Sequence, residues 1–285
     1  MLLADFIKGA TASLEGLYPQ REAQNIILIL CESRLGTRSY THIIEPQYSI
    51  GEDDMEWLDA AVDRLAMGEP IQHIIGFQEF CGRRFTVSRD VLIPRPETEL
   101  LVQEAVGRCT GRVLDLCTGS GCIAWSVALA LPGTEVVAVD LSEAALAVAE
   151  SQPFGHDQQE RGVIAPVFVK ADVLDTEQEF DHGMFSLILS NPPYIKDSER
   201  GSMRTNVLDH EPEMALFVPD EDPLVFYRAV ARWSQRFLQE GGSGITEINE
   251  TLGQETAQVF IDAGFRDVVV IKDLNSQDRF VRYCR

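Results

Sequence analysis

Several features are scarce or absent in this 285-residue sequence, and each absence excludes a class of protein. No CxxC pair occurs among the six cysteines and the five histidines are scattered, so neither a disulfide framework nor a metal-ligand spacing is present. No apolar run approaches the roughly 18 residues of a membrane-spanning helix. The N-terminal segment reaches Asp5 within one turn, without a basic stretch leading into an apolar one, so a secretory signal is not expected. We therefore expect reduced thiols, no metal, no membrane association and a cytoplasmic location.

Basic residues are also few. The 24 Lys and Arg against 45 Asp and Glu give a net charge of −21. Such a surface repels nucleic-acid phosphate, whose binding depends on neutralisation by Lys and Arg. It favours a basic protein partner or a small cationic ligand, although acidity alone also keeps a protein in solution. The length and the 45% of hydrophobic residues are typical of one large or two modest globular domains.

The first 75 residues have helical periodicity. In residues 20–36 the apolar side chains recur on one face and Gly36 is placed to end the helix. A second helix is predicted from the acidic residues 52–54 onward, with Met55, Leu58, Val62 and Leu65 on one face. Residues 1–76 contain five Lys and Arg against twelve Asp and Glu, so a DNA-binding role is not expected. This region is predicted to be a recognition or packing module.

A hairpin and a helix are predicted next. Apolar and polar residues alternate on both sides of Cys81 and Gly82, which is typical of a β-hairpin. Pro96 is placed at a helix start, with Glu97 and Glu99 in the first turn. The predicted domains are therefore a helical bundle over residues 1–75, a hairpin linker over 76–94, and an α/β domain over 95–285.

Strands alternate with helices in this last domain. Strands are predicted at 112–116, 135–140, 166–170, 185–190 and 244–248, with helical segments between most of them. This alternation predicts a mostly parallel sheet covered on both faces. Two final strands, 267–271 and 279–283, have no helix between them and must be antiparallel.

A glycine-rich turn joins the first of these strands to its helix. Gly119 and Gly121 let the backbone approach a ligand closely, and the following helix presents free N–H groups. Asp140 ends the next strand, where a carboxylate can accept both hydroxyls of a ribose. The same residues satisfy the G-x-G-x-x-A dinucleotide fingerprint, so an NAD-dependent enzyme remains an alternative, as does a purely structural turn.

Two further strands end in polar residues. Asp172 follows the third strand, where its carboxylate can accept from an adenine amino group with Val173 against the ring, although an acid here is also an ordinary loop residue. The fourth strand leads into Asn191-Pro192-Pro193-Tyr194. Neither proline has an N–H and both residues before a proline are held extended, so the Pro192 carbonyl is predicted to point outward.

The Asn191 side-chain oxygen and the Pro192 carbonyl make two adjacent acceptors. They match the two hydrogens of a planar –NH₂ group, on which Tyr194 can stack. A structural Pro-Pro turn is the alternative. In the common strand order the first and fourth strands are neighbours, which brings the glycine-rich turn and this tetrapeptide to one crevice. The sequence therefore predicts a cofactor site next to a site for an amine or amide nitrogen.

The chain resembles the HemK (PrmC) family of release-factor glutamine methyltransferases, which use S-adenosyl-L-methionine. The resemblance covers essentially the whole chain. It rests on Asn-Pro-Pro-Tyr at 191–194, Ile-Pro-Arg-Pro-Glu-Thr-Glu at 93–99, Pro-Ile-Gln-His at 70–73 with Gly76, and Glu211-Pro212 leading to Ala215-Leu216. It implies a seven-stranded, Rossmann-like methyltransferase sheet with an antiparallel last strand and a small all-α N-terminal domain that docks the release factor. The segment 196–213 is a candidate mobile flap over the substrate.

The resemblance also implies an activity and its residues. The enzyme would methylate the side-chain amide nitrogen of the glutamine in the Gly-Gly-Gln motif of peptide chain release factors, releasing S-adenosyl-L-homocysteine. The catalytic residues would be Asn191, Pro192 and Tyr194, and the whole tetrapeptide with Pro193 would bind the amide. The cofactor would be bound by Cys117, Thr118, Gly119, Ser120, Gly121, Asp140, Asp172, Val173 and Asn191. The family usually has a glycine where this chain has Cys117, and often an aromatic at the position of Val173.

Three other functions compete with this interpretation. A DNA adenine amino-methyltransferase uses the same Asn-Pro-Pro-aromatic logic but needs a basic groove, which a net charge of −21 does not indicate. An NAD-dependent oxidoreductase leaves the tetrapeptide unexplained, and a silent binding module leaves two sites without a purpose. We expect a monomer that contacts release factors and no nucleic acid directly.

Overall fold

The computed structural model describes residues 1–285, which divide into two compact units. The first unit comprises Met1–Phe77 and Arg204–His210, and the second comprises Gln78–Met203 and Glu211–Arg285. The segment Arg204–His210 therefore belongs with the N-terminal helices, whereas the sequence division placed it in the C-terminal domain. None of the helices is both long enough and apolar enough to cross a membrane.

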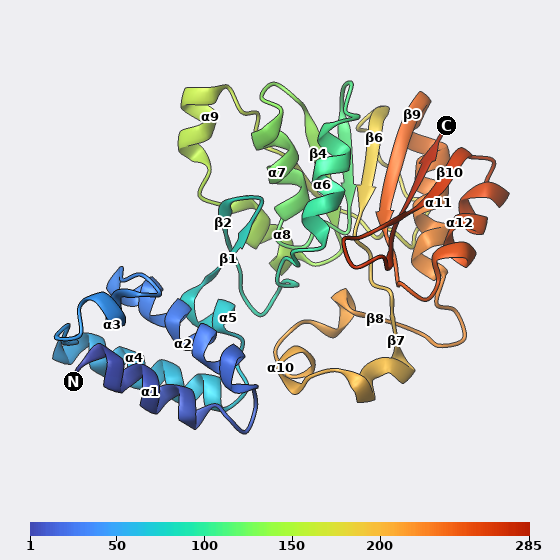
Figure 1. The fold of residues 1–285 in the computed structure, drawn as a ribbon. Coiled ribbons are helices and arrows are strands. Elements are labelled where there is room, and N and C mark those ends of the chain that lie inside the picture. Colours follow the sequence, from blue (N-terminus) through green and yellow to red (C-terminus); the bar gives the residue numbers. More distant parts are fainter. The chain divides into compact units, whose positions relative to one another are not determined.

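The first unit is a bundle of helices around one apolar core (Figure 1). Its helices are α1 (Leu3–Ser13), α2 (Gln20–Leu35), α3 (Thr41–Ile44), α4 (Glu52–Ala66) and α5 (Ile71–Ile75). The short helix α10 (Thr205–Leu208) belongs to the same unit but has no buried residue. As predicted, Gly36 ends helix α2. It has a φ of +64° and donates its N–H to the Glu32 carbonyl. Ile27 and Leu30 of α2 and Leu58 and Leu65 of α4 are fully buried, which confirms the predicted apolar faces.

The second unit contains a seven-stranded sheet. Its strands in spatial order are β10 (Arg266–Lys272), β11 (Asp278–Cys284), β9 (Leu238–Glu247), β6 (Phe185–Ser190), β3 (Val113–Leu116), β4 (Val136–Asp140) and β5 (Val167–Lys170). Strand β11 pairs antiparallel with both of its neighbours, and all the other pairs are parallel. The predicted fold class and antiparallel last strand are therefore confirmed. Strand β3 lies beside β6, so the turns that follow these two strands are neighbours, as predicted.

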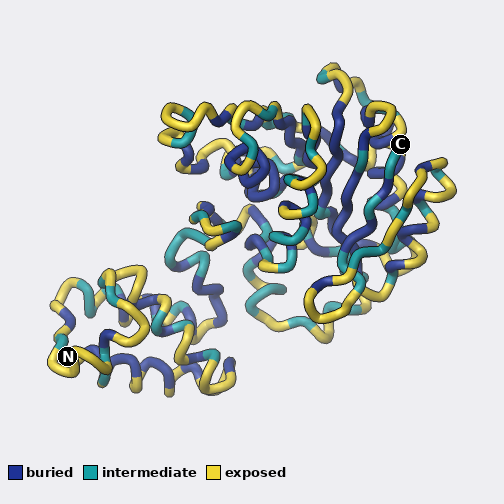
Figure 2. The backbone as a smooth tube through the Cα atoms, turned by 45° about the horizontal axis from the view of Figure 1, so that its top comes forward, coloured by how far each residue is buried: buried dark blue, intermediate teal, exposed yellow.

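Helices cover both faces of this sheet (Figure 1). On one face Leu114 and Leu116 of β3 pack with α11 (Val225–Phe237) and α12 (Gly253–Asp262). On the other face Val113 packs with α6 (Thr98–Val106) and α7 (Cys122–Ala130). Neighbouring residues of one strand thus enter two different cores, as the alternation of a strand demands. Figure 2 shows the central strands buried and the loops between elements largely exposed.

The remaining elements of this unit are short. They are the hairpin β1 (Phe77–Phe80) and β2 (Arg83–Thr86), α8 (Glu143–Glu150), α9 (Gly155–Arg161), β7 (Ile195–Lys196), the 3₁₀ turns Asp197–Ser202 and Glu213–Ala215, and β8 (Phe217–Val218). The hairpin turns at Cys81 and Gly82, which both have positive φ, as a two-residue turn between twisted strands requires. Regular α6 begins at Thr98 rather than Pro96, because i→i+3 hydrogen bonds from Thr98 and Glu99 make a tighter turn before it.

Candidate active site

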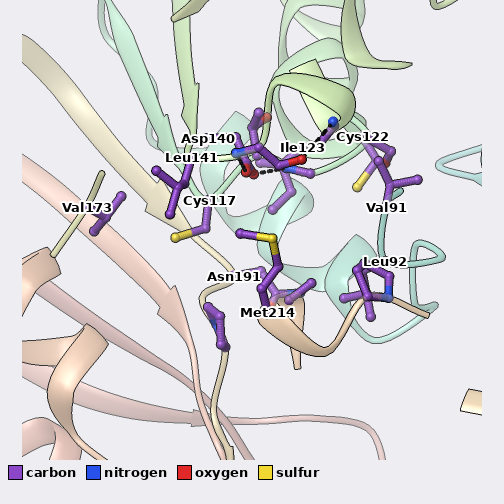
Figure 3. A pocket seen from close by; sticks show the side chains of 18 of the residues that line it. Val91, Leu92, Cys117, Cys122, Ile123, Asp140, Leu141, Val173, Asn191 and Met214 are labelled. Carbon is purple, nitrogen blue, oxygen red and sulfur yellow. Dashed lines mark hydrogen bonds between the residues drawn. The ribbon is translucent and has the colours of Figure 1, made fainter. Parts of the chain in front are cut away.

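A cavity of about 210 Å³ lies at the carboxyl ends of four parallel strands. Residues 117–120 follow β3, Asp140 ends β4 and residues 141–142 follow it, residues 171–174 follow β5, and Asn191 and Pro193 follow β6. Residues of two segments from elsewhere in the unit, 90–95 and 212–215, complete the wall (Figure 3) together with side chains of four helices, which are Thr98, Cys122, Ile123, Ala145 and Phe226. Ligands of doubly wound sheets bind at this edge, so the cavity is the first candidate for an active site.

The turn after β3 has three left-handed residues. Cys117, Gly119 and Gly121 have φ values of +61°, +53° and +77°. A side chain at Gly119 would meet nothing within 4 Å, whereas one at Gly121 would come within 3.0 Å of the Ala149 methyl group. Gly119 therefore leaves space at the cavity, and Gly121, which does not line it, lets α7 pack closely. Cys117 holds its backbone conformation at an intrinsic cost of about 1–2 kcal/mol.

Asp140 connects the ends of β3 and β4. Its Oδ2 accepts from the Gly119 N–H at 2.8 Å, and its Oδ1 accepts from the Ser142 N–H at 3.0 Å. Burial raises the pKa of this carboxyl above its ordinary value, and the backbone N–H donors partly oppose the rise. Each oxygen of a carboxylate accepts more than one hydrogen bond, so both retain capacity toward the cavity.

The end of β5 supplies Asp172 and Val173 to the same cavity. The Asp172 carboxylate accepts from the Leu174 N–H at 2.9 Å, which fixes the turn. Val173 is buried, and its carbonyl accepts from the Trp233 indole N–H at 3.0 Å, so α11 holds this wall in place. Of the nine residues predicted to bind the cofactor, Gly121 alone does not line the cavity.

The tetrapeptide after β6 divides between the cavity and the interior. Asn191 and Pro193 line the cavity, whereas Pro192 and Tyr194 do not. The Asn191 Nδ2 donates to the Thr98 hydroxyl at 3.3 Å, and no protein donor reaches the Pro192 carbonyl. The Tyr194 hydroxyl donates to Glu247 Oε1 at 3.1 Å, which holds this ring beside the core. The stacking surface predicted at Tyr194 is thus not part of the cavity wall in this structure.

A buried ion pair joins the two segments that complete the wall. Glu211 Oε1 accepts from the Arg95 guanidinium at 2.6 Å, and its Oε2 accepts from the Ile93 N–H at 2.9 Å. The Glu211 side chain is 1% exposed, and Pro212 directly after it lines the cavity. Met214 reaches into the cavity from the same segment (Figure 3). The sequence motifs around positions 95 and 211 therefore act together on one wall.

Three polar residues of this region were not predicted from the sequence as site residues. Asp115 in β3 and Glu247 in β9 are buried acids, and burial raises the pKa of each to about 7. Thr98 links Asn191 to Glu247, because its hydroxyl also donates to Glu247 Oε2 at 2.7 Å. An acid inside an otherwise apolar strand is costly without hydrogen-bond partners, and that is the sequence signal that points to Asp115 in β3. Glu247 ends β9, whose sequence is mostly polar or glycine, so it carries no such signal.

Comparison with known proteins assigns the chain to a family. Residues 5–76 match the family described as PrmC N-terminal domain, and residues 96–214 match the Methyltransferase small domain. A release factor glutamine methyltransferase of Bacteroides thetaiotaomicron is 40% identical over 271 residues, which are 94% of this chain and 95% of the relative. One from Flavobacterium psychrophilum is 32% identical, and the match covers 99% of this chain and 99% of the relative.

The chain is also similar to a solved structure. The release factor-specific protein-(glutamine-N5) methyltransferase of Alicyclobacillus acidocaldarius is 34% identical, with a TM-score of 0.40, and the match covers 70% of this chain and 98% of that one. The motifs that carry the resemblance in the sequence thus occur in a chain whose relatives share its length from end to end. This protein belongs to the family of release factor glutamine methyltransferases.

Proposed function

We propose that this protein transfers a methyl group from S-adenosyl-L-methionine to the side-chain amide nitrogen of the glutamine in the Gly-Gly-Gln motif of peptide chain release factors. The observation that carries the proposal is that Asn191 lines the same cavity as Gly119 and Asp140. An acceptor for an amide N–H therefore lies beside a pocket with the features of a nucleoside site.

The residues of the cavity fit the methyl donor. Asp140 retains acceptor capacity for ribose hydroxyls, and the open side of Gly119 leaves space beside the backbone. The apolar side chains Leu141, Val173 and Phe226 line the cavity where a purine ring requires flat apolar contacts, and Asp172 is placed to accept from its amino group. Bound there, S-adenosyl-L-methionine supplies an electrophilic methyl group on sulfur and leaves as S-adenosyl-L-homocysteine.

The protein's part in the reaction is to hold and polarise the amide. An amide nitrogen is a weak nucleophile because its lone pair is delocalised into the carbonyl. Alignment of the reacting atoms supplies up to about 7–11 kcal/mol of such a barrier. The Asn191 Oδ1 and the Pro192 carbonyl are proposed to accept the two amide hydrogens, which become more acidic as the nitrogen forms its new bond. These hydrogen bonds are stronger in the transition state than in the ground state, as catalysis requires.

The proton leaves late, to solvent or to a backbone acceptor. No His or Lys occurs in the tetrapeptide 191–194, and the acids of the site already accept hydrogen bonds from protein groups. Pro192 and Tyr194 do not line the cavity, so their proposed contacts with the glutamine require that the substrate reach past Asn191. The proposal therefore assigns the largest effect to Asn191.

The helical unit is proposed to recognise the release factor in the cytoplasm. Its match to the PrmC N-terminal domain and its excess of acidic residues support this role. A net charge of −21 supports a basic protein partner over DNA. We expect weaker binding of the release factor at high salt, because exposed charges are screened beyond the Debye length of about 8–10 Å at 0.1–0.15 M salt.

An Asn191→Ala variant tests the assignment of the site. Loss of one preorganised hydrogen-bonding group reduces turnover by roughly 10²–10³-fold, and binding of S-adenosyl-L-methionine falls much less. The assay follows methylation of an unmethylated bacterial release factor by mass spectrometry, with cofactor affinity measured by calorimetry. Asn275→Ala, at an exposed turn far along the chain, is the matched control and keeps its turnover. Unchanged turnover in Asn191→Ala contradicts the proposed site.

A further inference from the structure

Glu247 is a buried carboxyl that the chemistry described above does not use. It ends β9 and is 1% exposed. Its Oε2 accepts from the Thr98 hydroxyl at 2.7 Å, and its Oε1 accepts from the Tyr194 hydroxyl at 3.1 Å. Tyr194 is the last residue of the tetrapeptide, and the Thr98 hydroxyl accepts a hydrogen bond from Asn191, its first residue. The carboxyl therefore lies one side chain away from Asn191, through Thr98.

The direction of these hydrogen bonds fixes which end of the Asn191 amide faces Thr98. An ionised carboxylate only accepts, so the single hydrogen of the Thr98 hydroxyl points to Glu247. The Thr98 oxygen is left as an acceptor, and Asn191 must present its Nδ2–H group to it, at 3.3 Å. The Oδ1 atom is then the polar atom of Asn191 that no protein group occupies. This is the acceptor that the substrate amide requires.

We propose that Glu247 is a positioning residue that sets the polarity of the Asn191 side chain through Thr98. With Glu247 ionised, Oδ1 is available to accept from the glutamine amide. With Glu247 neutral, its own proton is donated to the Thr98 oxygen, and the Thr98 hydroxyl turns to donate to Oδ1. The Asn191 amide then presents N–H groups to the substrate N–H groups, which is repulsive. This inference rests on the proposed function and extends it to a residue outside the cavity wall.

The surroundings of Glu247 allow it to change charge near neutral pH. Burial is the main cause that raises its pKa to about 7, and the hydrogen bonds from Thr98 and Tyr194 oppose the rise. The titratable and charged groups that act on the carboxyl are Tyr194, Tyr227, Arg279 and Glu97. Arg279 pairs with Asp273 at 3.0 Å and so is not an exclusive partner. Turnover is expected to rise as the pH passes about 7, because the ionised carboxylate gives the productive polarity.

Variants of Glu247 and Thr98 separate positioning from packing. Glu247→Met removes both acceptors, so the Thr98 hydroxyl turns to Asn191, and kcat is expected to fall roughly 10²-fold with little change in the cofactor KM. Glu247→Gln is expected to abolish the rise in kcat near pH 7. Thr98→Val removes the hydroxyl that joins Asn191 to Glu247 and is expected to reduce kcat. Thr98→Ser keeps a hydroxyl at this position and is expected to retain more of the wild-type kcat. The matched control is Thr256→Val, at a buried threonine whose hydroxyl has no partner.

A second measurement does not depend on methyl transfer. The side-chain amide resonances of Asn191, identified by their loss in Asn191→Asp, are expected to shift with a midpoint near pH 7 in the wild-type protein. They are expected to be independent of pH in Glu247→Gln. If this titration is seen but no release factor is methylated, the proposed function fails and the positioning role stands. If the resonances do not titrate, or if Glu247→Met keeps wild-type kcat, the positioning role is overturned.

Discussion

Asp140→Asn tests the cofactor pocket directly. In the structure both oxygens of Asp140 accept from backbone N–H groups, at 2.8 Å from Gly119 and 3.0 Å from Ser142, and they keep capacity for two ribose hydroxyls. Asparagine removes the charge and replaces one acceptor with a donor. Hydrogen bonds to charged groups contribute about 1.5–3 kcal/mol each, so the variant loses one such bond and weakens another, about 2–4 kcal/mol in total. That loss raises the cofactor Kd by roughly 30- to 1000-fold.

The assay is isothermal titration with S-adenosyl-L-homocysteine, which binds without reacting. Glu143→Gln is the matched control: Glu143 lies three residues further on and is exposed, and its only ion pair is with Lys170 at 2.8 Å. We expect this control to bind with the wild-type Kd, and thermal unfolding to show both variants folded. The reasoning is refuted if Asp140→Asn keeps the wild-type Kd, or if the control loses as much affinity.

Three further outcomes follow from the packing and charges. Gly121→Ala should lower the free energy of unfolding by about 2–5 kcal/mol, because Gly121 has a positive φ and an added methyl group would lie 3.0 Å from the Ala149 side chain. Gly133→Ala is the control: its φ is +88° but the space around it is open, so it should lose only the backbone part, about 1–2 kcal/mol. Chemical denaturation measures both variants. Glu211→Gln should weaken the tie to Arg95 by about 1.5–3 kcal/mol and raise the cofactor KM, which steady-state kinetics checks. Burial raises the pKa of Asp115 to about 7 in the folded protein, whereas its ordinary value is 3.8. The folded state therefore binds more protons than the unfolded state between these two pH values, so the free energy of unfolding falls as the pH rises through them. Asp115→Asn should reduce this pH dependence, measured by chemical denaturation at several pH values.

The sequence was sufficient for the sheet and its order because most strands are short apolar runs between polar turns. The exception is β9, which was predicted at 244–248 but begins at Leu238, because residues 239–243 have no apolar pattern. The run Phe185–Ser190 was predicted with its observed bounds, and the neighbouring positions of β3 and β6 followed from the common order of such sheets. The start of α6 was predicted two residues too early. Pro96 favours a helix start, but a tight turn with i→i+3 hydrogen bonds precedes the regular helix at Thr98. The association of Arg204–His210 with the N-terminal helices had no periodic signal at all.

The candidate site was predictable wherever its residues directly follow a strand. Parallel strands end at one edge of a sheet, so Gly119, Asp140, Val173 and Asn191 had to come together. The sequence did not show which side of the tetrapeptide faces the cavity, and Tyr194 in fact points its hydroxyl to the interior. The contact between Thr98 and Glu247 joins residues 149 positions apart, and only the fold brings them together.

The most direct test of the account is the fate of one glutamine. The purified protein is incubated with S-adenosyl-L-methionine and an unmethylated bacterial release factor, and the peptide that contains Gly-Gly-Gln is fragmented in a mass spectrometer. Duplex DNA containing adenine is the parallel substrate. We predict one methyl group on the amide nitrogen of that glutamine, matched by an equal amount of S-adenosyl-L-homocysteine, and none on DNA. The proposal is contradicted if folded protein that binds the cofactor leaves the release factor unmodified. It is also contradicted if the methyl group is transferred to adenine instead.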